Sequence, residues 1–144
     1  MKVLFVCIAN TNRSQIAEAV FNKLSKKNEA QSAGIRPKNP GIYLKDEDHN
    51  PVVPMKDFGY DISKAKIKRL NPRLADWADK VVFVFYRKKH EKEIPTYLKK
   101  FKNKEFWDVG SISNETTFEE YRTLEKKRIK KIERLVKDLV KRIG

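Results

Sequence analysis

The chain has 144 residues, of which 40% are hydrophobic and 10% aromatic, so it can form a sizeable core and is not a disordered protein. Its 33 Lys and Arg residues outnumber 19 Asp and Glu residues, for a net charge of +14, and its single cysteine excludes an intramolecular disulfide framework. We therefore expect a single domain over residues 1–144 that resides in a reducing compartment, the cytoplasm.

The N-terminal part of the chain predicts a strand, a short polar loop and a helix. Residues 2–7 (KVLFVC) are a continuous apolar run, as in a strand buried on both faces. The run is too short to cross a membrane and lacks the cleavage pattern of a secretory signal. Residues 15–27 carry apolar side chains at helical spacing. A second strand is expected at 29–33, and a long loop over 35–51, where three prolines and a glycine stand.

The middle of the chain predicts two short helices and the clearest strand. Residues 52–58 form a short helix, and Asn71 is placed to cap a second one whose first turn starts with Pro72. Residues 80–86 (KVVFVFY) are apolar and β-prone, which predicts a buried strand. A charged helix follows and is interrupted near Pro95.

The C-terminal part predicts a last short strand at 105–109 and a long amphipathic helix that Thr117 is suited to cap. The apolar stripe of this helix consists of Phe118, Tyr121, Leu124, Ile129, Ile132, Leu135, Leu139, Val140 and Ile143. Because strands alternate with helices along the chain, we expect an α/β fold in which helices cover both faces of a parallel sheet.

The segment CIANTNRS at residues 7–14 puts the only cysteine at the end of the first strand. A lone cysteine is most often a small buried hydrophobe, and that interpretation stands beside a catalytic one. Ligands of open α/β sheets bind beyond the carboxyl ends of the strands, where the N–H groups of residues 8–13 and the helix N-terminus would form an anion site. The same field favours the thiolate form of Cys7, to which Ser14 can donate, and Arg13 matches two phosphate oxygens. These groups predict phosphoryl transfer through a cysteinyl-phosphate.

The pattern C-x5-R-S directly after the first strand resembles the low-molecular-weight protein tyrosine phosphatases, whose fold is shared with the thioredoxin-coupled arsenate reductases. Further segments resemble the family's landmarks in order: SAG at 32–34, NPVVPMKDFGYDIS at 50–63, ADKVVFV at 78–84 and WD…EEYR from 107 to 122. The resemblance covers nearly the whole chain. It implies a doubly wound four-stranded parallel sheet with helices on both faces, the phosphatase I-like fold, and a hydrolase with a cysteine nucleophile.

The resemblance also implies roles for single residues. Cys7 is the nucleophile, Arg13 clamps the phosphate, Ser14 hydrogen-bonds the thiolate, and the side chain of Asn10 braces the loop. The phosphate-binding loop comprises Ile8, Ala9, Asn10, Thr11, Asn12 and Arg13. Ala9 stands where the family usually has glycine, which predicts strain at that position. Asn12 replaces a second cysteine, common in eukaryotic members, that is thought to protect the nucleophile by forming a disulfide.

The family's general acid is the aspartate of an Asp-Pro pair shortly before the last helix, and this chain has no Asp-Pro pair. Alignment places Ser111 and Ile112 there, and a serine cannot usefully protonate a leaving phenolate. Asp108 is the nearest carboxylate and Glu115 the other candidate, although Asp108 is equally well interpreted as a strand-end residue that caps local backbone. The family's aromatic residues after the Asp-Pro pair are missing as well, so Tyr43 is the best remaining aromatic side chain for stacking on a substrate ring.

Three functions stay open at this point. The first is a phosphatase acting on phosphotyrosine proteins or small aryl phosphates. The second is an arsenate reductase, which RSQIAEA resembles; because the thioredoxin-coupled route needs two further cysteines, it would use an external thiol. The third is an oxyanion- or nucleic-acid-binding module with little catalysis. The basic segments 64–73 and 87–104 favour anionic partners, but a lysine-rich composition also serves solubility, and we do not expect nucleic acid to be the partner.

No cofactor, metal or membrane partner is expected. His49 and His90 lack Cys or paired carboxylate companions at ligand spacing, and we interpret both as surface residues. The sequence contains no Walker loop and no GxGxxG motif. Phosphate and arsenate oxyanions are the ligands that the cysteine loop predicts.

Overall fold

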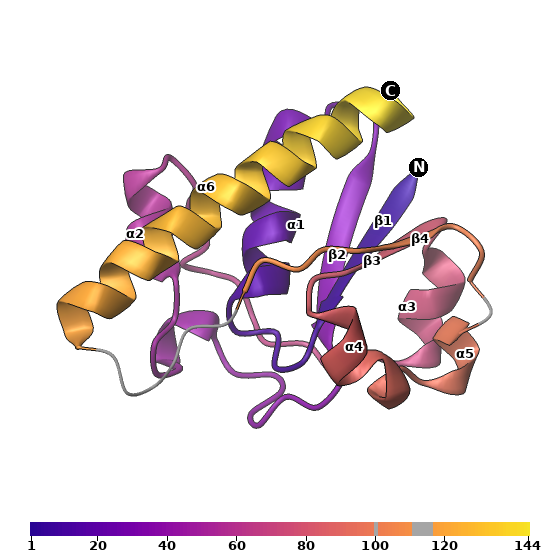
Figure 1. Cartoon of the computed structure of the whole chain (residues 1–144), viewed down its shortest axis with the longest axis horizontal. Helices are drawn as coiled ribbons and strands as arrows, with labels where there is room; N and C mark the ends of the chain where they lie inside the picture. Colours follow the sequence, from indigo (N-terminus) through magenta and orange to yellow (C-terminus); the bar gives the residue numbers. More distant parts are fainter. Residues whose placement is uncertain (100, 111–116) are drawn as a thin grey trace.

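The computed structural model describes residues 1–99, 101–110 and 117–144, and in these residues four parallel strands form one sheet (Figure 1). The strands are β1 (Lys2–Cys7), β2 (Glu29–Gly34), β3 (Lys80–Phe83) and β4 (Lys104–Phe106), in the order β2-β1-β3-β4. β1 pairs with β2 and β3, and Cys7 stands opposite Gly34. This arrangement confirms the doubly wound α/β fold that the sequence predicts.

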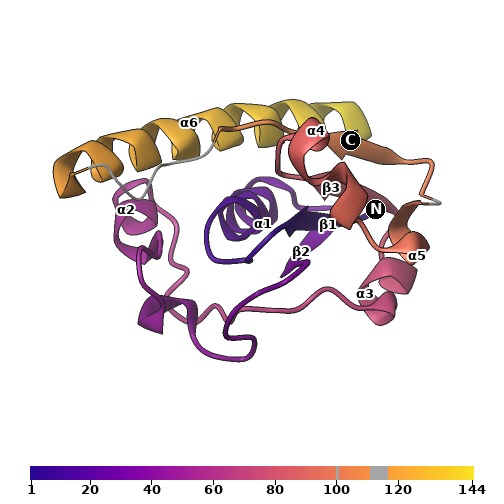
Figure 2. The ribbon, with the colours of Figure 1, turned by 60° about the horizontal axis from the view of Figure 1, so that its bottom comes forward.

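Helices cover both faces of the sheet. On one face lie α1 (Arg13–Leu24), α2 (Val52–Asp57) and the long α6 (Phe118–Ile143). On the other lie α3 (Pro72–Trp77) and α5 (Thr96–Lys99), as Figures 1 and 2 show. The remaining elements are a short helix and two 3₁₀ turns: α4 (Arg87–His90), η1 (Leu44–Asp46) and η2 (Glu91–Glu93). None of the helices in the described part of the chain is both long and apolar enough to cross a membrane.

Two helix starts are fixed by the side chains that the sequence predicts. The Leu74 N–H donates to Asn71 Oδ1 at 3.1 Å, which caps α3. Thr117 and Glu120 form a reciprocal capping box at the start of α6: the Glu120 N–H donates to Thr117 Oγ1 (3.1 Å), and the Thr117 N–H donates to a carboxylate oxygen of Glu120 (3.4 Å). Both caps therefore confirm the expectation.

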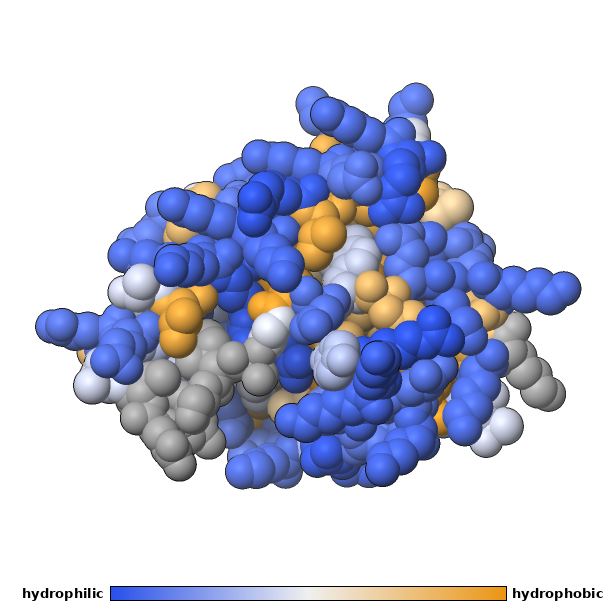
Figure 3. Space-filling view, in the orientation of Figure 1, coloured by the Kyte–Doolittle hydropathy of each residue, from blue (hydrophilic) through white to orange (hydrophobic). Residues whose placement is uncertain are grey.

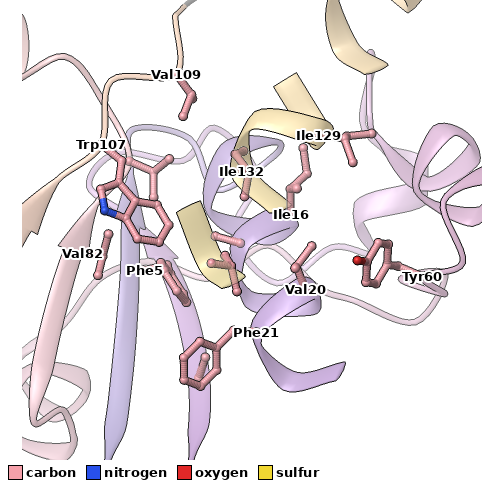
Figure 4. Close-up of a cluster of buried hydrophobic side chains, with 14 of the residues drawn as sticks. Phe5, Ile16, Val20, Phe21, Tyr60, Val82, Trp107, Val109, Ile129 and Ile132 are labelled. Carbon is pink, nitrogen blue, oxygen red and sulfur yellow. The ribbon is translucent and has the colours of Figure 1, made fainter. Parts of the chain in front are cut away.

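The side chains of β1 alternate between two apolar clusters, which explains its unbroken apolar run. Figure 4 shows the cluster between the sheet, α1 and α6, in which Phe5 contacts Phe21 and Trp107 with ring centroids 5.9 and 5.6 Å apart. Leu4 belongs to the second cluster, on the α3 and α5 side, together with Phe83. β1 is therefore buried on both faces, and the two clusters fix the position of its last residue, Cys7.

Strand and helix ends differ from the sequence prediction. β3 ends at Phe83 rather than at residue 86, because after one more bond, from the Val84 N–H to Val6 O (2.7 Å), the chain leaves the ladder. β4 covers 104–106 instead of 105–109, and α1 ends at Leu24 where the backbone becomes extended. The apolar run at 80–86 thus continues beyond the residues that pair within the sheet.

The predicted stripe of α6 is wrong at the N-terminal end of the helix. Phe118 and Leu124 are 70% and 39% exposed, whereas Glu125 and Arg128 are buried. Further along the helix, apolar residues do face the core, among them Ile129 and the others of that part: Ile132, Val136 and Leu139. Glu125 and Arg128 contact Asn12 of the polar loop after β1 instead of the apolar core, so polar side chains face inward at that part of α6.

The two histidines differ in exposure. His49 is exposed, as expected. His90 is hydrogen-bonded to Glu93 and packs against the ring of Phe85, so only 13% of its side chain is exposed, and the expectation of a surface residue was wrong. No group of three or more potential metal ligands occurs in the described residues.

Candidate active site

The loop after Cys7 lies at the point of the sheet where the order of strand addition reverses. From β1 the chain first builds β2 on one side and later β3 on the other, so the carboxyl end of β1 is the topological switch point. Figure 2 brings this edge forward and shows α1 almost end-on beside it. The site therefore stands where doubly wound folds bind their ligands.

The sulfur of Cys7 is held by two groups of the loop and helix. Cys7 is 2% exposed. Its Sγ lies 2.8 Å from Ser14 Oγ and accepts the Asn10 N–H at 3.2 Å. Because Ser14 Oγ itself accepts from Asn10 Nδ2 (2.8 Å), its single hydrogen is left for the sulfur. Both contacts therefore place a hydrogen-bond donor against the sulfur.

Asn10 is the centre of the loop's hydrogen bonds. Its Nδ2 donates to Ser14 Oγ and Ser32 Oγ (3.0 Å), and its Oδ1 accepts from Gln15 Nε2 (2.9 Å) and the Lys68 N–H (2.8 Å). Its backbone is left-handed, with φ of 57°, which asparagine tolerates better than most residues. Asn10 thus braces the loop, as the family resemblance implies.

The expected strain at Ala9 is not found. The positive φ falls on Asn10 and not on Ala9, so alanine fits that position. The glycine that the loop does require is Gly34, where an added β-carbon would lie 2.8 Å from Ile8 O and 2.9 Å from Asn10 N. The SAG segment therefore supplies both a hydrogen-bond acceptor, Ser32, and the close approach of β2 to the loop.

Arg13 and Asn12 stand at the start of α1. Arg13 is its first residue and is partly exposed. Asn12 precedes it but makes no side-chain cap hydrogen bond. The N–H groups of the first turn of a helix have no acceptor within the helix, so they form a natural anion site.

A buried polar network below the loop is what sequence reasoning missed. Asn12 Nδ2 donates to Glu125 Oε2 (3.3 Å), while Arg128 donates through Nη1 to Asn12 Oδ1 (2.9 Å) and through Nη2 to Gly110 O (3.0 Å). Burial raises the pKa of Glu125, although Arg122 acts in the other direction. Burial and the charge of Arg13 lower the pKa of Arg128 to about 10. The available signal was the i, i+3, i+7 spacing of residues 125, 128 and 132, which places two charges in the inward stripe.

Asp108 and Tyr43 lie outside this cluster of contacts. Asp108 is exposed after β4, and its Oδ1 accepts the Gly110 N–H at 3.0 Å, which is the backbone-capping role weighed against catalysis. Tyr43 is 43% exposed and pairs with Lys66, whose carbonyl accepts from Gln15 Nε2 (2.9 Å). Tyr43 is thereby connected to Asn10 of the loop through two residues, Lys66 and Gln15.

The remaining candidates, Ser111, Ile112 and Glu115, fall outside the described residues. The structure thus brings Cys7, Asn10 and Ser14 together, whereas the side chain of Asn12 contacts Glu125 and Arg128 of α6.

Known proteins resemble the chain over nearly its whole length. The family model of the low molecular weight phosphotyrosine protein phosphatases matches residues 2–144. A comparison with curated proteins gave no match.

Solved structures similar to the chain include phosphatases and a reductase. The YwlE arginine phosphatase, as a cysteine-to-serine mutant with a phosphorylated active-site serine, is 21% identical with a TM-score of 0.79, covering 99% of this chain and 95% of its own. A low molecular weight protein tyrosine phosphatase from T. tengcongensis is 27% identical, with a TM-score of 0.70 and 99% of both chains covered. An arsenate reductase in the phosphate-binding state is 22% identical, with a TM-score of 0.66, covering 95% of this chain and 97% of its own.

Proposed function

Because the chain belongs to the low molecular weight phosphotyrosine protein phosphatase family, we propose that it hydrolyses phosphotyrosine or other aryl phosphate monoesters with Cys7 as the nucleophile. The observation that carries this proposal is the hydrogen-bond chain from Asn10 through Ser14 to the sulfur of Cys7. A cysteine that serves only as a small apolar side chain needs no such donor. In this proposal residues 1–144 form one domain and work in the cytoplasm, where the thiol stays reduced.

The reaction proceeds in two steps. The Cys7 thiolate attacks phosphorus, and an S–P bond forms while the P–O bond to the leaving phenolate breaks. The backbone N–H groups of the loop and the Arg13 guanidinium bind the three other oxygens. Water then attacks the phosphocysteine, inorganic phosphate departs, and the thiolate is regenerated.

The leaving phenolate takes a proton from an acid. Asp108 is the proposed donor and Glu115 the alternative. For Asp108 to act, its side chain has to turn from the Gly110 N–H toward the substrate. A general acid contributes roughly 10²–10⁴-fold to such a step, and more for a basic leaving group. Tyr43, in the long loop after β2, is the proposed contact for the substrate ring.

A second candidate function is arsenate reduction. It is favoured by the anion site itself, since arsenate has the shape and charge of phosphate, and by the similarity to an arsenate reductase structure. With one cysteine in the chain, the two electrons for reduction come from two external thiol groups, which are joined in a disulfide as they are oxidised. The similarity to an arginine phosphatase adds phosphoarginine to the substrates worth testing.

One set of assays separates these functions. Phosphate release is measured from 4-nitrophenyl phosphate, phenyl phosphate, a phosphotyrosine peptide and a phosphoarginine peptide, and arsenite formation from arsenate with glutathione. We expect the aryl phosphates to turn over, with Cys7→Ser inactive. The rate ratio of 4-nitrophenyl to phenyl phosphate shows whether an acid acts, because only phenolate needs the proton. Turnover that survives in Cys7→Ser, or none with any phosphate ester, contradicts the proposal.

A further inference from the structure

Asn12 occupies the position directly before α1, where an asparagine normally caps the helix. Its side chain makes no cap hydrogen bond, and its backbone (φ −144°, ψ −86°) departs from the extended conformation usual for capping residues. The first-turn N–H groups of α1 are therefore not occupied by this side chain.

Two charged residues of α6 hold the Asn12 side chain instead. Its Nδ2 donates to Glu125 Oε2 (3.3 Å), and its Oδ1 accepts from Arg128 Nη1 (2.9 Å). Both ends of the amide are engaged. Glu125 is fully buried and Arg128 is 8% exposed. We call this pair, Glu125 and Arg128, the Asn12 clamp.

Burying the charged side chains of Glu125 and Arg128 costs desolvation free energy, so their presence at these positions requires a reason. The Nη groups of Arg128 donate to neutral oxygens, and its buried Nε has no partner. Within the residues that the structure describes, Arg128 forms no ion pair, while Glu125 pairs with Arg122 at 3.1 Å. Apolar side chains such as Ile129 and Ile132 would fill buried space on this helix without desolvating charge. The charged pair thus provides something that apolar packing does not.

We propose that Glu125 and Arg128 are positioning residues that keep Asn12 from capping α1 and so leave its first-turn N–H groups to the phosphoryl oxygens. The inference rests on the proposed function, because the anion concerned is the phosphoryl group of its substrate. Released from the clamp, Asn12 Oδ1 would accept the N–H of Ser14 or Gln15, the second and third residues of the helix. The enzyme would then compete with its own substrate for these donors.

The expected size of the effect follows from capping energies. An asparagine cap contributes about 1 kcal/mol, which corresponds to about fivefold weaker binding of an anion that needs the same N–H groups. The effect of removing Arg128 therefore depends on what stands at position 12. This dependence separates positioning from a direct electrostatic action of Arg128 on the anion.

A double-mutant cycle between positions 12 and 128 tests the clamp. The probe is inorganic phosphate, whose dissociation constant is measured by protection of Cys7 from iodoacetamide. We expect Arg128→Met to weaken phosphate binding about fivefold in the natural chain and less than about twofold in an Asn12→Ala background, which has no capping oxygen. The matched control is Arg134→Met, which removes one exposed positive charge from the same helix and should change binding less than about twofold.

Each outcome decides the matter. Equal losses in the two backgrounds would mean that Arg128 acts through its charge, and would overturn the clamp, as would an unchanged affinity of Arg128→Met. If circular dichroism shows that Arg128→Met is unfolded, Arg128→Gln takes its place with the same expected pattern. If phosphate protects Cys7 in the natural protein but the cycle shows no coupling, only the proposal of the clamp is overturned. If phosphate does not protect Cys7 in the natural protein, the proposed function is overturned as well.

Discussion

Two residues fix the curvature of the loop after Cys7: Asn10, which belongs to the loop, and Gly34, which lies on the neighbouring strand β2. Asn10 takes a left-handed backbone and uses both ends of its amide for hydrogen bonds to neighbouring segments. Gly34 stands opposite Cys7 in the register of β1 and β2, and the loop backbone passes directly over it. The shape of the proposed anion site is thus set by two residues whose side chains are not expected to contact the anion.

We expect Gly34→Ala to weaken phosphate binding by about tenfold or more. The new β-carbon would lie 2.8 Å from Ile8 O and 2.9 Å from Asn10 N, so the loop backbone has to move. Overpacking of this kind also costs roughly 1–3 kcal/mol of stability. Protection of Cys7 from alkylation measures the first effect and thermal unfolding the second. Gln31→Ala, on the same strand, is the control for both, and a Gly34→Ala protein with natural affinity would contradict the expectation.

Single residues were predictable where they lie close together in sequence. Cys7 and Ser14 share one short segment, so the spacing of strand, loop and helix is enough to bring them into contact. Asn12 also belongs to that segment, but its partners on α6 lie 113 and 116 positions away. Only the packing of the finished helix brings them below the loop.

The edge strand β4 pairs with β3 and is also held by charged side chains. It has three residues, with Glu105 at its centre. The Glu105 carboxylate accepts two hydrogen bonds from the Arg142 guanidinium (2.8 and 2.9 Å) and one from Trp107 Nε1 (3.1 Å), and it forms an ion pair with Lys80 Nζ (2.8 Å). These contacts join the strand to β3 and to the C-terminal end of α6. Lys80 is itself buried, so Glu105 also compensates a buried positive charge.

We expect Glu105→Gln to destabilise the protein at pH 7 by roughly 2–4 kcal/mol. Burial opposes ionisation of Glu105, but the hydrogen bonds from Arg142, Lys80 and Trp107 outweigh it and lower its pKa to about 2, from the usual 4.5. The stabilisation is therefore complete above about pH 4.5 and is lost as the pH falls toward 2.

Urea unfolding at several pH values measures this difference between the natural protein and Glu105→Gln. Glu29→Gln, at an exposed position of β2, serves as the control and should show little difference at any pH. A difference for Glu105→Gln that is the same at neutral and at strongly acidic pH would rule out the carboxylate as its source.

Elements were predicted well where their signal is local. The caps at Asn71 and Thr117 depend on residues three positions apart, and both appear as expected. The stripe of α6 misled at Phe118 and Leu124, because the hydrophobic period says which side of a helix is apolar and not how far the core beneath it extends. Beyond these residues, Glu125 and Arg128 face the polar side chain of Asn12.

The charge of the whole molecule acts over longer distances than any of these contacts. Figure 3 shows hydrophilic residues over most of the visible face, including α6. The net charge is +14, and basic side chains such as Lys127, Lys130 and Lys131 lie along the exposed side of that helix. Such a surface attracts anions before they reach a site.

We expect kcat/KM for 4-nitrophenyl phosphate to fall about threefold or more between about 0.02 M and 0.5 M sodium chloride, with kcat nearly constant. The substrate is an anion, and salt at the higher concentration screens charges beyond a few ångströms. Alkylation of Cys7 by iodoacetamide, which is neutral, is the control and should change little. A kcat/KM independent of salt would show that the surface charge has no part in substrate capture.

The contacts of the loop also constrain when the protein becomes reactive during its synthesis. Asn10 is braced by the backbone of Lys68, and Asn12 is held by Arg128, so the loop has its final shape only after both segments have left the ribosome. Nascent chains emerge from the N-terminus first, and Cys7 is among the earliest residues to appear. Until residue 128 follows, the loop lacks the contact from Arg128 to Asn12. Although Cys7, the proposed nucleophile, is nearly the first residue made, the loop beside it is completed close to the last.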